Sequence, residues 1–302
     1  MKKTLIALAA FSVVGLASAQ STATISGTIA AGWIKSLDDD KGLVLDSNSI
    51  KFDLVEDLGN GLKISAATQF AGNSNRGANI AKEDTSLAIS GGFGSVAFQN
   101  TRSSSWAVNY GMVGENWLWD GVYSSNHLEI FGRTKTDIIS YTSPAFSGVN
   151  LVASFAEEAD GSGTPTSKRS SLGAKYAAGP LSGGARYIRS SNDTWGNNIN
   201  KGKFEAGVYY DFGVAKVGLG LDGKRVGNDK SEKAAFTAGI AVPFGKFSTG
   251  INFAKRDESN VTELSLNYAL SKRSSVYANY GRTHFASGLN CNQGNLVLVH
   301  SF

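Results

Sequence analysis

Most of the chain consists of short runs in which apolar and polar side chains alternate, and these runs end at turns rich in glycine. One early run is an example: Ile50, Phe52 and Leu54 lie on one face, and Lys51 and Asp53 lie on the other. A period of two predicts a β-strand with one apolar and one polar face. The pattern therefore favours an all-β chain whose strands each face two different environments.

Sixteen runs show this alternation of apolar and polar residues. The connections between them are alternately short Gly/Pro turns and longer polar segments. Strands of this kind, with short turns on one side and long loops on the other, are typical of outer-membrane barrels. The barrel must close, because lipid cannot satisfy an open sheet edge. We predict an all-β, 16-stranded antiparallel transmembrane β-barrel over residues 20–302, with strands at 23–33, 49–56, 62–70, 83–90, 95–101, 135–142, 149–156, 168–176, 181–189, 203–210, 214–224, 232–242, 246–255, 261–270, 275–282 and 295–302.

Aromatic residues gather at the ends of the apolar stripes, as expected for the girdles that flank a lipid-facing band. The residues on the opposite face of each strand are too polar for that face to be a second buried face, as a soluble protein would require. The first strand differs, because its outward face carries the small residues Ala23, Gly27 and Ala31 and suits packing against protein. The aromatic positions are Trp33, Phe70, Phe155, Tyr176, Tyr187, Phe204, Tyr210, Phe212, Phe236, Phe247, Phe253, Tyr268 and Phe302.

The first nineteen residues have the organisation of a secretory signal peptide. Lys2 and Lys3 precede an apolar stretch at 5–16 and a small-residue cleavage site at 17–19. The stretch is too short for a spanning helix. Without the two lysines the chain has only two more basic than acidic residues and no basic block, so nucleic-acid binding is not expected. Cys291 has no partner cysteine, and we expect an unpaired thiol in a loop.

Residues 101–133 interrupt the alternation. This segment holds three of the five tryptophans and the acids Glu115, Asp120 and Glu129, and it has no Lys or Arg between Ser103 and Gly132. A structureless loop of this length is uncommon and is usually functional. We expect it to fold into the barrel lumen and narrow the pore, with an ordinary long surface loop as the alternative.

Four turns and the chain end resemble the general diffusion porins of Gram-negative bacteria, nearest the trimeric, sixteen-stranded porins of beta-proteobacteria. The turns are at 56–63, 90–94, 141–148 and 270–277, and the end, Val299-His300-Ser301-Phe302, is similar to the family's His-x-Phe terminus. The resemblance covers the whole mature chain. It implies a homotrimer in the bacterial outer membrane, in contact with lipid and lipopolysaccharide, with Phe302 read by the barrel insertion machinery and the third loop inside each pore.

The charges of the expected pore wall depart from this family pattern. Relatives often oppose the acidic third loop with arginines, but here Ser49, Asp53, Asp84 and Asn100 stand at such positions. The remaining basic candidates are Lys51, Arg102, Arg133, Lys135 and Arg186. Opposed rings of charge select ions, and narrow walls focus their field. We predict a mixed wall and a weaker anion preference than in arginine-lined relatives, while each charge considered singly could equally be a solvated rim group.

No pattern in the sequence favours an enzyme. His127, His284 and His300 lack the spacing of metal ligands, and no Gly-x-Ser-x-Gly motif is present. The Gly-x-Gly pairs open no helix that could hold phosphate. We therefore predict no catalytic residues, metal or cofactor, and a channel for passive diffusion of ions and small hydrophilic solutes. The alternatives are a porin specific for a sugar or an organic acid, an outer-membrane enzyme, and a structural barrel with a plugged lumen.

Overall fold

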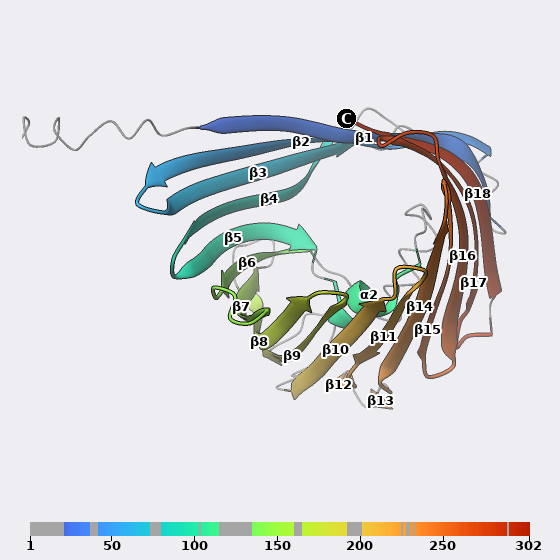
Figure 1. Ribbon diagram of the computed structural model, residues 1–302. Coiled ribbons are helices and arrows are strands. Elements are labelled where there is room, and N and C mark those ends of the chain that lie inside the picture. The colour runs from blue at the N-terminus through green and yellow to red at the C-terminus, as the bar shows by residue number, and fades with distance from the viewer. Residues whose placement is uncertain are drawn as a thin grey trace, which may run out of the picture.

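The computed structural model describes residues 21–36, 42–72, 80–102, 104–114, 135–159, 165–191, 201–224, 226–227, 230–231, 233–288 and 290–302. Sixteen strands form one closed antiparallel barrel in which each strand pairs with its two neighbours. Figure 1 shows these strands arranged in a ring. The prediction of a sixteen-stranded barrel is confirmed, and each predicted strand corresponds to one observed strand. The predicted signal peptide, residues 1–19, lies outside the described residues.

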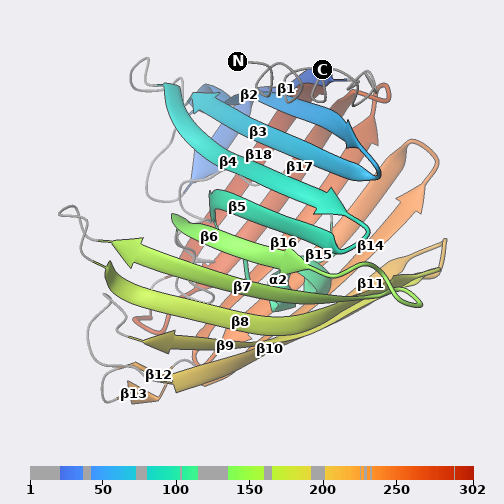
Figure 2. The same cartoon turned by 90° about the vertical axis from the view of Figure 1, so that its left-hand side faces the viewer.

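The barrel strands run obliquely around the wall (Figure 2), as closure requires. Their bounds are β1 Thr22–Ser36, β2 Gly42–Gly59, β3 Leu62–Gly72, β4 Ile80–Gly91, β5 Gly94–Arg102, β6 Lys135–Thr142, β7 Val149–Ala159, β8 Pro165–Ala178, β9 Leu181–Ser191, β10 Lys201–Asp211, β11 Lys216–Asp222, β14 Ala235–Phe244, β15 Phe247–Arg256, β16 Ser259–Ala269, β17 Ser274–His284 and β18 Asn290–Ser301. A separate hairpin joins β12 (Val226–Gly227) to β13 (Lys230–Ser231), and one helix is described, α2 (Trp106–Gly111).

The barrel closes where its first and last strands meet. Thr28 of β1 pairs with Ser301 of β18, and the backbone N–H groups of Gly27 and Phe302 each donate to the other residue's carbonyl at 3.0 Å. Thr22 also pairs with Val55, just before the short turn that ends β2. The start of β1 and the end of β18 therefore lie at the short-turn end of the barrel.

The two faces of the wall follow the alternation in the sequence. In β11, Val217, Leu219 and Leu221 are exposed on the outside, while Gly220 and Asp222 are buried on the inside. Eleven of the thirteen aromatics assigned to the girdles have large exposed outer surfaces, and Phe253 and Tyr268 are half-buried. An apolar outer band around a polar interior is the arrangement that a bilayer demands.

The first short turn shows why its sequence is Asn-Gly. Asn60 and Gly61 have φ values of 54° and 77°, and a two-residue hairpin with both central residues at positive φ matches the twist of its strands. Glycine adopts this conformation without strain, and asparagine is among the residues that tolerate it best.

Two expectations about local structure are wrong. Cys291 is buried in β18 instead of lying in a loop, because β18 begins five residues earlier than the alternation indicated. The segment 101–133 is not structureless at its start: residues 101–102 end β5, and α2 follows directly. A six-residue helix is too short to be stable alone, so its stability comes from packing that a linear pattern does not contain. Among the described residues, no helix is both long and apolar enough to cross a membrane.

Candidate functional site

Helix α2 lies inside the ring of strands, against the inner faces of β9, β10, β11 and β14 (Figure 1). Glycines on those strands allow the close approach. A Cβ atom at Gly207 would come within 2.6 Å of the Trp106 carbonyl oxygen, and one at Gly239 within 2.6 Å of the Val113 nitrogen. Glycine within a strand often marks such a contact between two backbones. The inward glycines of this wall thus form a seat for α2.

Two carboxylates hold the N-terminus of α2. The hydroxyl of Ser105, the N-cap residue, donates to Asp222 Oδ2 at 2.6 Å and also accepts a hydrogen bond from the Ala107 N–H at 3.3 Å. The Trp106 N–H donates to Glu205 Oε2 at 3.1 Å. The first N–H groups of a helix have no partner within it and favour negative charge. Glu205 and Asp222 therefore complete the start of the helix from the barrel wall.

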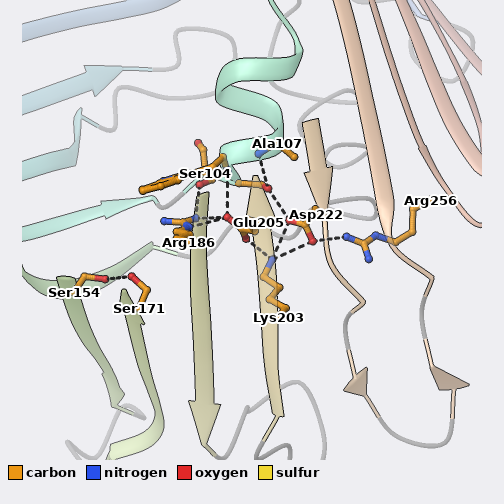
Figure 3. A network of polar contacts seen from close by, with 11 residues as sticks. Ser104, Ala107, Ser154, Ser171, Arg186, Lys203, Glu205, Asp222 and Arg256 are labelled. Carbon is orange, nitrogen blue, oxygen red and sulfur yellow. Dashed lines mark hydrogen bonds and ion pairs between the residues drawn. The ribbon is translucent and has the colours of Figure 1, made fainter. Parts of the chain in front are cut away.

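Three cations compensate these two acids (Figure 3). Arg186 Nη2 lies 2.6 Å from Glu205 Oε2, and Arg256 Nη2 lies 2.8 Å from Asp222 Oδ1. Lys203 Nζ bridges the acids, at 2.6 Å from Glu205 Oε1 and 3.0 Å from Asp222 Oδ2. Both carboxylates are almost completely buried. A buried charge left without a partner is strongly destabilising, so each acid needs the two cations that it has.

The network also reaches the chain just before and just after the start of α2. Arg186 Nη2 donates to the Ser104 carbonyl at 2.9 Å, and the Thr237 hydroxyl donates to the Ala107 carbonyl at 2.6 Å. Beyond the helix, the Asn252 side-chain amide pairs with Gly114, accepting from its N–H at 2.7 Å and donating to its carbonyl at 2.8 Å. Residues 104–114 are thus fixed to the inner wall at both ends.

Aromatic rings line the same part of the wall. Lys175 Nζ and Arg186 Cζ lie 5.3 and 5.0 Å from the centre of the Trp106 ring, within the range of cation–π attraction. Tyr110 stands between Trp106 and Tyr209, with ring centres 6.4 and 6.2 Å away. Burial and the nearby Tyr209 phenol raise the pKa of Tyr110 above its usual value, so this phenol stays neutral at physiological pH.

Several residues predicted for the pore wall face inward. Lys51 and Asp53 have the parity opposite to the exposed Phe52 and form an ion pair at 2.7 Å. Asp84 accepts a hydrogen bond from the Thr101 hydroxyl at 2.9 Å. Arg186 belongs to the network that holds α2. These positions agree with a place on the inner wall, and their part in ion passage stays a prediction.

Other predicted site residues are not brought together. Asn100 shares the outward parity of the exposed Phe98 and bonds to Asp137 at 2.6 Å, so it does not stand on the inner wall as expected. Residues Arg102 and Lys135 are backbone partners in β5 and β6, and their side chains lie outside the described residues. Four further predicted residues also lie outside them: Glu115, Asp120, Glu129 and Arg133.

Sequence reasoning missed most of the charged network. The inward parity that selected Asp53 also applies to four of the five missed residues, because each of the four has an outward apolar or aromatic neighbour. The fifth, Arg256, lies between Lys255 and Asp257 and lacks that signal. That signal does not reveal which charges touch each other or carry a helix. The missed residues are Lys175, Lys203, Glu205, Asp222 and Arg256. Within the described part of the chain, no group of three or more His, Cys, Asp or Glu side chains could hold a metal ion.

Comparisons with known proteins agree with this architecture. The chain is 27% identical over 316 aligned residues to outer membrane porin protein 32 of Delftia acidovorans, covering 92% of this chain and 88% of that protein. An anion-selective porin from Comamonas acidovorans has a similar structure, with a TM-score of 0.69 and 19% identity over 94% of this chain and all of that one. The trimer form of OmpT from Vibrio cholerae has a TM-score of 0.68 and 15% identity over 93% of this chain and 99% of that one.

The match to a family description extends over almost the entire sequence. Residues 4–287 match the family described as Gram-negative porin. A closed sixteen-stranded barrel with an apolar outer band and a polar interior is the structure such a channel requires. The family and the fold are those of a pore, not of an enzyme. This chain belongs to the Gram-negative porins and is a diffusion channel of the bacterial outer membrane.

Proposed function

We propose that residues 101–133 narrow the lumen and that the channel passes ions and small hydrophilic solutes through the remaining opening. The observation that carries this proposal is the attachment of residues 104–114 to the inner wall at both ends, through Ser105, Trp106 and Gly114. A segment held inside the barrel at its start directs the residues that follow into the same space. Burying the carboxylates of Glu205 and Asp222 costs free energy. A need to hold residues 104–114 in a fixed position accounts for that cost.

The proposed constriction has charges on two facing walls. Lys51 and Asp53 are on β2, which is eight strands from β10 in either direction around the ring. The helix that starts the proposed constriction is seated on β10 and its neighbours. In the proposed constriction, Glu115, Asp120 and Glu129 are the acidic side. The basic members are Lys51 on the facing wall, Arg186 beside the helix, and Arg102, Arg133 and Lys135, which flank the segment in the sequence.

The mixed wall favours a weaker anion preference than in arginine-lined relatives. Lys51 and Arg186, the described basic members of the proposed constriction, both pair with carboxylates at 2.6–2.7 Å. A cation that is already compensated contributes little to the field beyond a Debye length of about 8 Å at physiological salt. Asp53 and Asp84 add negative charge to the wall itself.

The constriction can be tested by single-channel conductance and by the size of polyethylene glycols that enter the pore. A variant with residues 115–133 replaced by a short glycine–serine linker should conduct more and admit larger polymers than the wild type. The matched control replaces residues 192–200, another connection at the long-loop end, in the same way and should leave both quantities unchanged. Equal conductance of wild type and the first variant would disprove the constriction.

We propose a homotrimer for the assembly. The outward face of β1 offers Ala23, Gly27 and Ala31, which suit a protein partner better than lipid, and one structurally similar porin is described as a trimer form. Light scattering in mild detergent should give three copies, and a monomer would contradict this. The rest of the surface faces lipid and lipopolysaccharide. Removal of a signal peptide at 1–19 predicts Gln20 as the first residue of the mature protein, which amino-terminal sequencing checks.

One observation favours the alternative of a solute-specific porin. Cations and aromatic rings stand close together on the inner wall, where Lys175 and Arg186 face Trp106 and Lys216 faces Tyr209. A general diffusion channel needs charged side chains at its constriction, but it does not need aromatic rings beside them. Liposome swelling with sugars and organic acids of equal size separates the two functions, because only the specific porin distinguishes them.

A further inference from the structure

A hollow of about 420 Å³ opens on the inner side of the wall between the turns that follow β8 and β10. Its lining includes Pro180 and Ser182 from one side and Tyr209, Asp211 and Lys216 from the other. Both turns are short, which places the hollow at the short-turn, periplasmic end of the pore. A solute entering or leaving the channel at this end passes the hollow.

The ammonium group of Lys216 is the positive charge of this hollow. Its Nζ lies 5.3 Å from the centre of the Tyr209 ring and 3.9 Å from Asp211 Oδ2, which is a long ion pair. The other carboxylate oxygen, Asp211 Oδ1, accepts the Gly213 N–H at 2.8 Å and so belongs to the turn. Lys216 is 38% exposed, so its charge is only partly compensated and is open to a second anion.

The rest of the hollow offers an apolar surface and a hydroxyl. The Tyr209 and Pro180 rings supply the apolar part, and Ser182 supplies a hydrogen-bonding group. Tyr209 also continues through Tyr110 to Trp106, the ring beside Lys175. Three successive rings therefore lead from the hollow to α2, with Lys216 at the first ring and Lys175 at the last.

We infer that this hollow is a transient binding station for small aromatic carboxylates. The carboxylate pairs with Lys216, and the aromatic ring packs on Tyr209 and Pro180. This inference rests on the proposed function, because a solute bound at the hollow acts on transport only if the pore conducts. An open and half-exposed site suits the task, since conduction requires a solute to bind well enough to enter and weakly enough to leave.

The test measures the KCl current through single channels while benzoate is added on the short-turn side. Benzoate should reduce the wild-type current with saturation, and it should do so at lower concentration than acetate, which lacks the ring, or benzyl alcohol, which lacks the charge. Equal effects of benzoate and acetate would overturn the role of the rings. An equal effect of benzyl alcohol would overturn the role of the charge.

Matched variants locate the site. Lys216→Gln should raise the half-saturating benzoate concentration about fivefold, the loss expected for one exposed charged contact. Lys246→Gln removes the same charge from an exposed turn at the same end and should change nothing. Asp211→Asn keeps an acceptor for the Gly213 N–H but removes the competing charge, so it should tighten benzoate binding. Equal shifts in the two lysine variants would overturn the inference.

The ring contact has its own pair of variants. Tyr209→Leu should weaken the effect of benzoate and leave that of acetate unchanged, whereas Tyr209→Phe keeps the ring and should behave like the wild type. A leucine variant that retains wild-type benzoate sensitivity would overturn the contact. Wild-type channels that carry no KCl current would contradict the proposed function instead, whereas conducting channels on which benzoate has no effect would contradict this inference alone.

Discussion

The hydroxyl of Ser105 donates a hydrogen bond to Asp222 at 2.6 Å, although 117 positions separate the two residues in the chain. The contact joins the start of α2 to the inner face of β11, and Asp222 is in turn held by Lys203 and Arg256. The position of the helix inside the barrel therefore depends on buried charges of the wall. If the segment after α2 narrows the pore, these charges also govern its opening.

Loss of the Ser105 hydroxyl should loosen the start of α2. Ser105→Ala removes an N-cap, which costs about 1 kcal/mol, and leaves Asp222 with one donor fewer. We expect stronger low-frequency fluctuations of the open-channel current. Ser104→Ala is the control, because Ser104 meets Arg186 through its backbone carbonyl. Indistinguishable noise in the two variants would show that this bond does not hold the segment.

A side chain at Gly220 should displace α2 from its seat. The added Cβ would overlap the Ala107 carbonyl oxygen and the Thr237 hydroxyl. Overpacking of this kind costs about 1–3 kcal/mol, so Gly220→Ala should lower the temperature at which the folded barrel unfolds in detergent and raise current noise. Gly92→Ala, at a turn where a Cβ meets nothing within 4 Å, should have the stability of the wild type. A Gly220→Ala barrel as stable and quiet as that control would contradict the close packing.

Removal of two acids from the wall should move selectivity toward anions. Asp53→Asn frees Lys51 from its 2.7 Å ion pair, and Asp84→Asn keeps an acceptor for the Thr101 hydroxyl while losing its charge. At an effective dielectric near 20, one charge at 4 Å is worth about 4 kcal/mol before screening. The reversal potential across a tenfold KCl gradient measures the shift.

The control for this selectivity test is Asp257→Asn, which removes an acid from the exposed turn after β15. It should leave the reversal potential unchanged, because salt screens the charge of a solvent-exposed turn. If the double variant is no more anion-selective than the wild type, or if the wild type is already strongly anion-selective, then Asp53 and Asp84 do not determine the ion selectivity of the pore.

Phe302 should be needed for efficient insertion into the outer membrane. Its side chain is exposed on the outer face, while its backbone closes the barrel against Gly27. Phe302→Ser keeps the backbone pairing and removes the ring, so we expect a clear fall in the amount of folded protein in outer-membrane fractions. Phe302→Tyr retains an aromatic ring and should insert normally. Normal levels of the serine variant would refute the prediction.

The sequence by itself determined the barrel. Alternation in Ile50–Phe52–Leu54 against Lys51 and Asp53 assigns one face to lipid and one to water, and the Asn60-Gly61 turn sets the join between two strands. These are local properties with a period of two, and a membrane leaves only closed pairing for such strands. Strand number, closure and the outer girdle follow from that, as does the inward parity of Arg186.

The tertiary structure alone decided which inward charges meet. Glu205 and Asp222 lie on neighbouring strands, but nothing in the sequence links them to Ser105 or shows that a six-residue helix would form there. A short helix has too few hydrogen bonds to stabilise itself, so it exists only where a wall supplies its partners. Those partners come from strands far along the chain, and the pairing becomes visible only when closure brings them to one face.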